Sequence, residues 1–274
     1  MFDTVIEMLS YPFMTRAFLV GSLVALCSAL LGVSLVLKRY SMIGDGLSHV
    51  GFGAMAIAAA MNAAPLTVAI PVVIVAAILL LRISGNAKIK GDAAIALIST
   101  TSLAVGVMVI SLTTGMNTDV YNYMFGSILA MSAEDVKLRL VLSVFVLILF
   151  IVFYHKIFAI TFDETFARAT GVKAGVYNTL IAVLTAVTIV LGMRMMGALL
   201  ISSLIIFPAL TSMRVCRTFK SVIINAAVIS VVCLIAGVTL SYVAATPAGA
   251  SVVLANLVMM VLYTVVGAVK NHMR

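Results

Sequence analysis

Charged side chains are scarce in this 274-residue sequence, which contains 9 acidic residues, 17 basic residues and 3 histidines. Asp, Glu, Lys and Arg make up 9% of the chain, against roughly a quarter in soluble domains. Hydrophobic residues make up 64%, and the mean hydropathy is +1.27. A soluble fold of this composition would expose far too much apolar surface. We therefore expect an all-α polytopic membrane protein, with residues 1–274 forming a single domain because no long polar stretch exists to form a second.

Several functional motifs are also absent. The sequence has no H-E-x-x-H pair, which excludes an intramembrane zinc protease of that type, and no G-x-x-x-x-G-K-[ST] loop, which excludes nucleotide hydrolysis through a P-loop. The three cysteines form no C-x-x-C pair and are expected to be small buried residues. The N-terminus has neither a basic stretch nor a small-residue cleavage site, so no removable signal peptide is expected. The net charge of +8 indicates a positive-inside bias and argues against nucleic-acid binding, because the basic residues sit at span ends.

Nine apolar stretches are long enough to cross a bilayer, which needs about 20 residues. They are residues 16–37, 44–62, 65–82, 92–113, 137–157, 174–193, 196–213, 219–243 and 249–269. Thirteen of the 17 basic residues lie in the five loops 38–43, 82–91, 155–173, 214–220 and 270–274. With nine spans these loops share one side, which the positive-inside rule makes cytoplasmic. The N-terminus is then outside and the C-terminus inside.

One further segment, residues 118–135, is apolar only in its middle. It is too short to cross comfortably, so we expect a re-entrant or interfacial helix. If it does cross, the protein has ten spans and the basic residues of its N-terminal half lie outside.

An aspartate and a histidine four residues apart, Asp45 and His49, stand in the stretch MIGDGLSHVGFGA at residues 42–54. Residues i and i+4 share a helix face, and a carboxylate and an imidazole are good ligands for first-row divalent metals. Two ligands do not complete a site, but a two-fold dimer would bring four to one axis. The alternative is a hydrogen-bonded pair that only anchors helix packing or caps the helix. The orientation above places Asp45 near the cytoplasmic end of its span.

The most polar long stretch between two spans is TFDETFARATGVK, residues 161–173. Its acidic residues suit the start of a short helix, which Thr161 is placed to cap and Gly171 to end. Two phenylalanines give this helix an apolar stripe that fits a groove on another protein. The alternative is an amphipathic connector on the membrane surface. The predicted docking residues are Phe162, Asp163, Glu164, Phe166, Ala167 and Gly171.

Polar residues also interrupt the apolar stretch GALLISSLIIFPALTSM, residues 197–213. Pro208 removes one backbone donor and is able to kink the helix. We expect Ser202, Ser203 and Pro208 either to line a path or, equally well, to serve inter-helix packing and hydrogen bonding.

Together these stretches resemble the permease subunit of bacterial zinc, manganese and iron ABC importers. The resemblance rests on five ordered motifs that cover residues 16–270, namely KRYSMIGDGLSH, YMFGSILAMSAEDV, FDETFARATGV, GALLISSLIIFPALT and TPAGASVVL. The family pattern commonly has proline where Glu164 stands, and other residues where Thr170 stands. Both Asp45 and His49 match positions that carry the transmembrane metal ligands in that family. The fold implied is of the type II ABC importer kind, with 8–9 transmembrane helices, a short re-entrant helix and a cytoplasmic coupling helix.

The resemblance further implies a multi-pass protein of the bacterial cell membrane with a cytoplasmic C-terminus and a second permease protomer. Its partners would be a cytoplasmic ABC ATPase dimer, which carries out the ATP hydrolysis, and an extracytoplasmic metal-binding protein. No cofactor would be bound permanently, and the transported ion would be zinc, then manganese or iron, since a mixed N/O site suits all three. The alternatives are an ABC permease for a metal chelate or cobalamin, an ATPase-independent divalent metal transporter, and a non-transporting membrane scaffold.

Overall fold

The structure is a computed structural model that describes residues 10–84, 91–113, 126 and 133–272, and these residues form α-helices joined by short connections. The helices are α2 (Pro12–Leu37), α3 (Ile43–Ala60), α4 (Pro65–Ser84), α5 (Gly91–Thr113), α7 (Ala133–Val152), α8 (Tyr154–Phe162), α9 (Glu164–Ala169), α10 (Ala174–Met213), α11 (Phe219–Ala244) and α12 (Ala248–His272). The all-α prediction is therefore confirmed.

Within the described residues, eight helical segments are long and apolar enough to span a membrane, and α7 with α8 makes a ninth if the bent pair is counted as one. Two of the eight, residues 174–193 and 195–213, lie in α10, and the non-helical Gly197, with φ 81° and ψ 160°, kinks the helix close to their boundary. The predicted span at 137–157 corresponds to the bent pair, in which α7 ends at Val152 and α8 turns away from it by 67°. The predicted re-entrant segment at 118–135 lies almost wholly outside the described residues.

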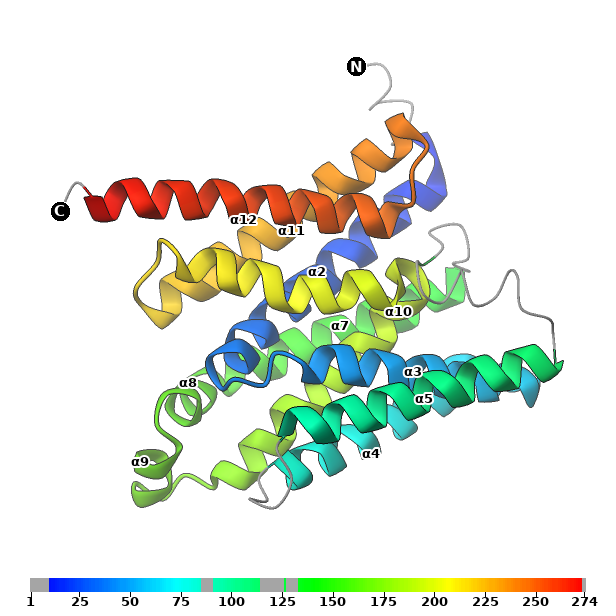
Figure 1. The fold of residues 1–274 in the computed structure, drawn as a ribbon, viewed down its shortest axis with the longest axis horizontal. Coiled ribbons are helices and arrows are strands. Elements are labelled where there is room, and N and C mark those ends of the chain that lie inside the picture. The colour runs from blue at the N-terminus through cyan, green and yellow to red at the C-terminus, as the bar shows by residue number, and fades with distance from the viewer. Residues whose placement is uncertain (1–9, 85–90, 114–125, 127–132, 273–274) are drawn as a thin grey trace.

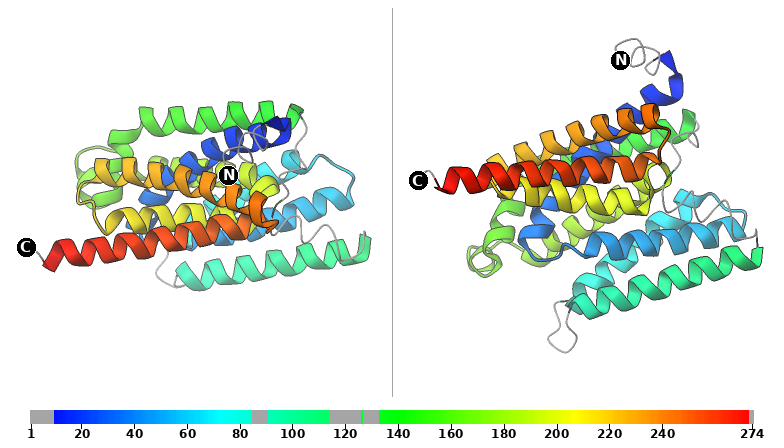
Figure 2. Two further views of the ribbon diagram at one scale, coloured as in Figure 1. Left: turned by 90° about the horizontal axis from the view of Figure 1, so that it is seen from above. Right: turned by 45° about the horizontal axis from the view of Figure 1, so that its top comes forward.

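The long helices form two groups that meet along α10 (Figure 1). In one group α2 packs against α10 and α11, and α12 lies on α10 and α11 at the edge (Figures 1 and 2). In the other group α3 packs between α4 and α5 and also contacts α10. The short helices α8 and α9 lie together at one end of the bundle, where α2 ends and α10 begins (Figure 1).

Small residues allow the helices of each group to approach closely. A Cβ atom added at Gly32 of α2 would overlap the backbone oxygen of Ile205 in α10, and one added at Gly53 of α3 would lie 2.7 Å from the backbone oxygen of Ser102 in α5. In a membrane the lipid is as apolar as the side chains, so close van der Waals packing of this kind stabilises helix pairs.

Candidate metal site and coupling helix

Asp45 and His49 stand on one face in the first two turns of α3, as their spacing predicts. The His49 Nε2 atom lies 3.7 Å from Asp45 Oδ2. The side chain of Asp45 is 40% exposed and that of His49 is 21% exposed, so both donor groups are accessible. They are flanked by buried glycines at 44, 46, 51 and 53.

A serine cluster supports Asp45. Ser202 of α10 approaches the carboxylate, with its Oγ 3.4 Å from Asp45 Oδ1. Ser48 donates to the backbone oxygen of Asp45 and its Oγ lies 3.3 Å from that of Ser202. The structure thus places Ser202 beside the Asp–His pair, which is the position expected of a serine that lines a translocation path. Ser203 instead donates to the Leu200 carbonyl, and Pro208 is buried further along α10. Sequence reasoning missed Ser48, although its i+3 spacing from Asp45 was the available signal.

The pair alone offers one carboxylate and one imidazole. In the part of the chain that the structure describes, no cluster of three or more His, Cys, Asp or Glu side chains stands where it could hold a metal. Both side chains are exposed enough that a metal ion bound to them could take further ligands from outside the protomer, whether from water or from a second copy of the chain.

The pair lies deeper in the bundle than its place in the sequence indicates. Ser202, which contacts Asp45, follows the break at Gly197 by five residues and precedes the end of α10 at Met213 by eleven. At about 1.5 Å per residue, Ser202 is therefore roughly 8 Å along the helix from this break and roughly 17 Å from the end of α10, and Asp45 lies beside it. Further along α3, Gly51 packs against Met193, just before the same break. Hence α3 begins part-way along α10, and the preceding connection 38–42 reaches into the bundle.

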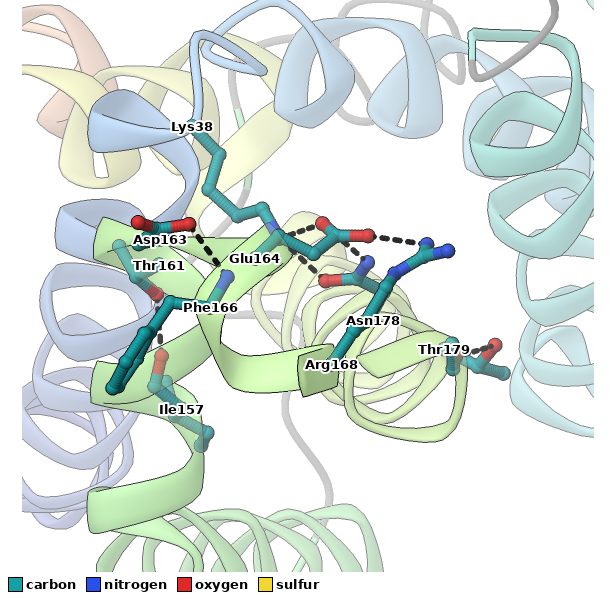
Figure 3. Close-up of polar contacts among 10 residues, drawn as sticks. Lys38, Ile157, Thr161, Asp163, Glu164, Phe166, Arg168, Asn178 and Thr179 are labelled. Carbon is teal, nitrogen blue, oxygen red and sulfur yellow. Dashed lines mark hydrogen bonds and ion pairs between the residues drawn. The ribbon is translucent and has the colours of Figure 1, made fainter. Parts of the chain in front are cut away.

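The polar segment 161–173 contains the short helix α9 (Figure 3). Asp163 caps it, with its Oδ1 accepting a 2.8 Å hydrogen bond from the Phe166 backbone N–H. The prediction that Thr161 caps this helix is wrong, because Thr161 belongs to α8 and donates to the Ile157 carbonyl. The predicted end at Gly171 is confirmed. Gly171 has φ 85°, and the N–H of Val172 reaches back to the Ala167 carbonyl at 2.9 Å, which together close the helix in a Schellman motif.

The six predicted docking residues differ in what they present. Phe162 and Phe166 are 59% and 65% exposed. Such large apolar surfaces suit an interface. Ala167 is buried, at 1% exposure, and the Asp163 carboxylate is committed to the cap. Gly171 has open space beside it. The docking role itself stays a prediction.

Glu164 turns towards its own protein rather than outwards (Figure 3). Its Oε2 accepts hydrogen bonds from Lys38 Nζ at 3.1 Å and Asn178 Nδ2 at 3.0 Å, and its Oε1 accepts one from Arg168 at 2.6 Å. Partial burial raises the pKa of this carboxyl group, but the hydrogen bonds from Asn178, Arg168 and Lys38 and the Lys38 charge outweigh it, and the pKa falls to about 2. Sequence reasoning missed Lys38 and Asn178. The available signals were a lysine at the end of a span and an asparagine in the first turns of an apolar helix.

A comparison with known protein families matches residues 10–267 to the family described as the ABC 3 transport family. The chain belongs to the ABC 3 transport family. The match covers nearly every described helix, including the Asp–His pair and α9. As a member of this family the protein is a membrane-embedded transport permease.

Individual relatives agree with this assignment. The solved structure titled "PsaBC from Streptococcus pneumoniae in complex with Fab" superposes with a TM-score of 0.86 at 26% identity, covering 95% of this chain and 94% of that one. The high-affinity zinc uptake system membrane protein ZnuB of Haemophilus influenzae is 30% identical over 90% of this chain and 94% of its own. The manganese transport system membrane protein MntC of Halalkalibacterium halodurans is 28% identical over 90% and 85%, respectively. These matches leave no large part of either chain uncovered.

Proposed function

We propose that this chain is the permease of an ATP-driven importer of divalent metal ions, with zinc the first expected substrate and manganese or iron next. The observation that carries the proposal is the accessible Asp45–His49 pair, inside the bundle of a chain that belongs to an ABC transport family. Relatives that match nearly the whole chain are named for zinc and for manganese transport. The same pair would be out of place in a permease for a bulky chelate, which needs no paired ligands.

The ligand count favours a dimer. Zinc takes four ligands in a tetrahedron, with His N and Asp O at about 2.0–2.2 Å. Two protomers that each supply Asp45 and His49 would provide such a set, whereas manganese would need additional oxygen ligands. The metal is the cargo, so it must bind weakly enough to leave, and an incomplete site in each protomer suits that requirement.

The coupling helix α9 connects metal transport to ATP hydrolysis. ATP hydrolysis takes place in a separate cytoplasmic ATPase dimer that docks on the end of α8 and on α9, through exposed Phe162 and Phe166, respectively. An extracytoplasmic binding protein delivers the ion to the other side. The protein lies in the bacterial cell membrane with its C-terminus in the cytoplasm, on the same side as α9. Movement of α9 rocks the two permease halves and exposes the Asp45–His49 site alternately to each side.

The test is metal accumulation by cells that lack their own zinc uptake and express this chain with its ATPase and binding protein. Asp45→Ala and His49→Ala should each abolish accumulation while leaving membrane levels and ATPase binding unchanged. His155→Ala is the matched control, because His155 is an exposed histidine near the start of α8 rather than on α3 or α10. The metal that disappears, measured by mass spectrometry, identifies the substrate. Normal accumulation in both variants would refute the proposal.

A further inference from the structure

The Glu164 carboxylate joins three helices that are distant in the sequence. Lys38 stands at the C-cap of α2, Glu164 opens α9, and Asn178 lies in the first turns of α10. Besides its 3.1 Å contact with Glu164, Lys38 Nζ donates to Asn178 Oδ1 at 2.5 Å, so the three side chains close a ring of hydrogen bonds (Figure 3). The predicted coupling helix is therefore fixed to two spans by side chains as well as by its own chain ends.

This ring is shielded, unlike an ordinary surface ion pair. The Lys38 side chain is 10% exposed and that of Glu164 is 32% exposed. Exposed pairs contribute little because water and salt screen them, whereas a partly buried charge that loses its partner is costly. Arg168 contacts the same carboxylate, but it is 64% exposed and belongs to α9 itself, so its contact joins nothing beyond that helix.

Lys38 is close in the chain to the candidate metal site. Only seven positions separate it from Asp45, and the connection between them is held in one shape. The N–H of Tyr40 bonds to the Leu35 carbonyl at 2.8 Å and the N–H of Ile43 to the Tyr40 carbonyl at 3.0 Å, while Arg39 is held at φ 61°. A displacement of α9 that carries Lys38 with it must therefore move the start of α3, where Asp45 stands.

We propose that Lys38, Glu164 and Asn178 form the joint through which movement of α9 reaches the Asp45–His49 site. They are positioning residues that touch neither the metal nor the ATPase. The proposal rests on the function proposed above, since it presupposes that conformational changes in a bound ATPase move α9. It changes the role assigned to Glu164, from a docking residue to a link within the permease.

The test uses the full complex of permease, ATPase and binding protein in proteoliposomes, and measures zinc ions accumulated per ATP hydrolysed. Lys38→Met and Asn178→Ala should each lower this ratio by about tenfold, a typical size for coupling between two sites, while ATPase binding and zinc binding by the complex stay unchanged. Lys38→Arg, which keeps the charge, should retain most of the ratio. Arg168→Met is the matched control, because it removes a bond to the same carboxylate without breaking a link between helices, and it should leave the ratio within about twofold, as expected for an exposed pair.

Each alternative result has a distinct meaning. If the wild-type complex accumulates no metal with ATP, the proposed function fails. If it does accumulate metal and both Lys38→Met and Asn178→Ala keep the wild-type ratio, the joint is refuted. An equal loss in Arg168→Met would also refute it, because the bond within α9 would then matter as much as the bonds between helices. If one of the two variants, Lys38→Met or Asn178→Ala, does not assemble with the ATPase, the ratio measured for the other variant decides the test, since the two residues lie on different helices.

Discussion

Replacing Glu164 by glutamine removes the charge at the centre of the joint and keeps an oxygen that accepts hydrogen bonds. The carboxylate now has three donors around it, two of them cationic. A glutamine side chain at this position would keep at most part of the hydrogen bonding and none of the charge attraction. We therefore expect Glu164→Gln to lower the stability of the purified permease at neutral pH.

The magnitude follows from the pKa of Glu164, which the folded protein lowers from the ordinary 4.5 to about 2. At about 1.4 kcal/mol per pH unit, a lowering of this size corresponds to at most about 3.5 kcal/mol. The side chain remains 32% exposed, so solvent screening reduces this value. We expect a loss of about 1–2 kcal/mol, or roughly 3–6 °C in the melting temperature of a protein of this size.

The pH dependence provides the stricter test. Because the pKa is lower in the folded state, the stabilisation is fully present above about pH 4.5 and is lost as the pH falls towards about 2. Thermal melting of wild type and Glu164→Gln in detergent should therefore give a constant difference from pH 8 to about 5.5, which narrows below about 4.5. Arg168→Met is the control for the exposed bond. A difference that already narrows between pH 7 and 5.5, or no difference at pH 7, would show that the carboxylate is not held in this way.

Three further variants test other parts of the molecule. Phe166→Asp places a charge on an apolar side chain that is 65% exposed, and should reduce ATPase retained on the affinity-purified permease by at least about tenfold, as loss of an interface anchor does; unchanged retention would contradict the docking role of α9. Gly32→Ala forces a methyl group onto the Ile205 backbone and should cost about 1–3 kcal/mol or more in thermal unfolding, whereas Gly175→Ala, with nothing within 4 Å, should be neutral. Ser202→Ala removes a long hydrogen bond to Asp45 and should weaken metal binding by about two- to fivefold, measured by titration of the purified permease with zinc.

Hydrophobicity alone predicted most of the helices, because each span is long, apolar and bounded by charged or turn residues. It could not predict the bend between α7 and α8. Residues 144–153 are all apolar, so nothing in the composition around Val152 marks the 67° turn that follows it. After that turn, Phe158 and Phe162 of α8 pack against Phe219 of α11 in tilted and edge-to-face arrangements, with ring centroids 5.2 and 5.7 Å apart, a long-range contact that composition does not reveal. The break within α10 was predictable as a gap between spans, and Gly197 provides the conformation that it needs.

The sequence predicted which residues within one motif lie together, but it did not predict the contacts between residues of different motifs. Spacing placed Asp45 and His49 on one face because four residues make about one helical turn. Spacing could not bring Ser202 to Asp45, nor Lys38 to Glu164, since these pairs are separated by 157 and 126 positions.

The depth of the Asp45–His49 pair in the bundle also depends on contacts between distant motifs. Charge counting placed Asp45 beside the cytoplasmic boundary, because it follows the basic residues Lys38 and Arg39 so closely. In the structure Lys38 is satisfied inside the protein by Glu164 and Asn178, so it does not have to reach the solvent beyond the bundle. The start of α3 sits part-way along α10, where Asp45 meets Ser202. The four residues between Lys38 and Ile43 therefore carry the chain from the joint that we propose to the depth of the Asp45–His49 pair, although the pair follows a basic loop.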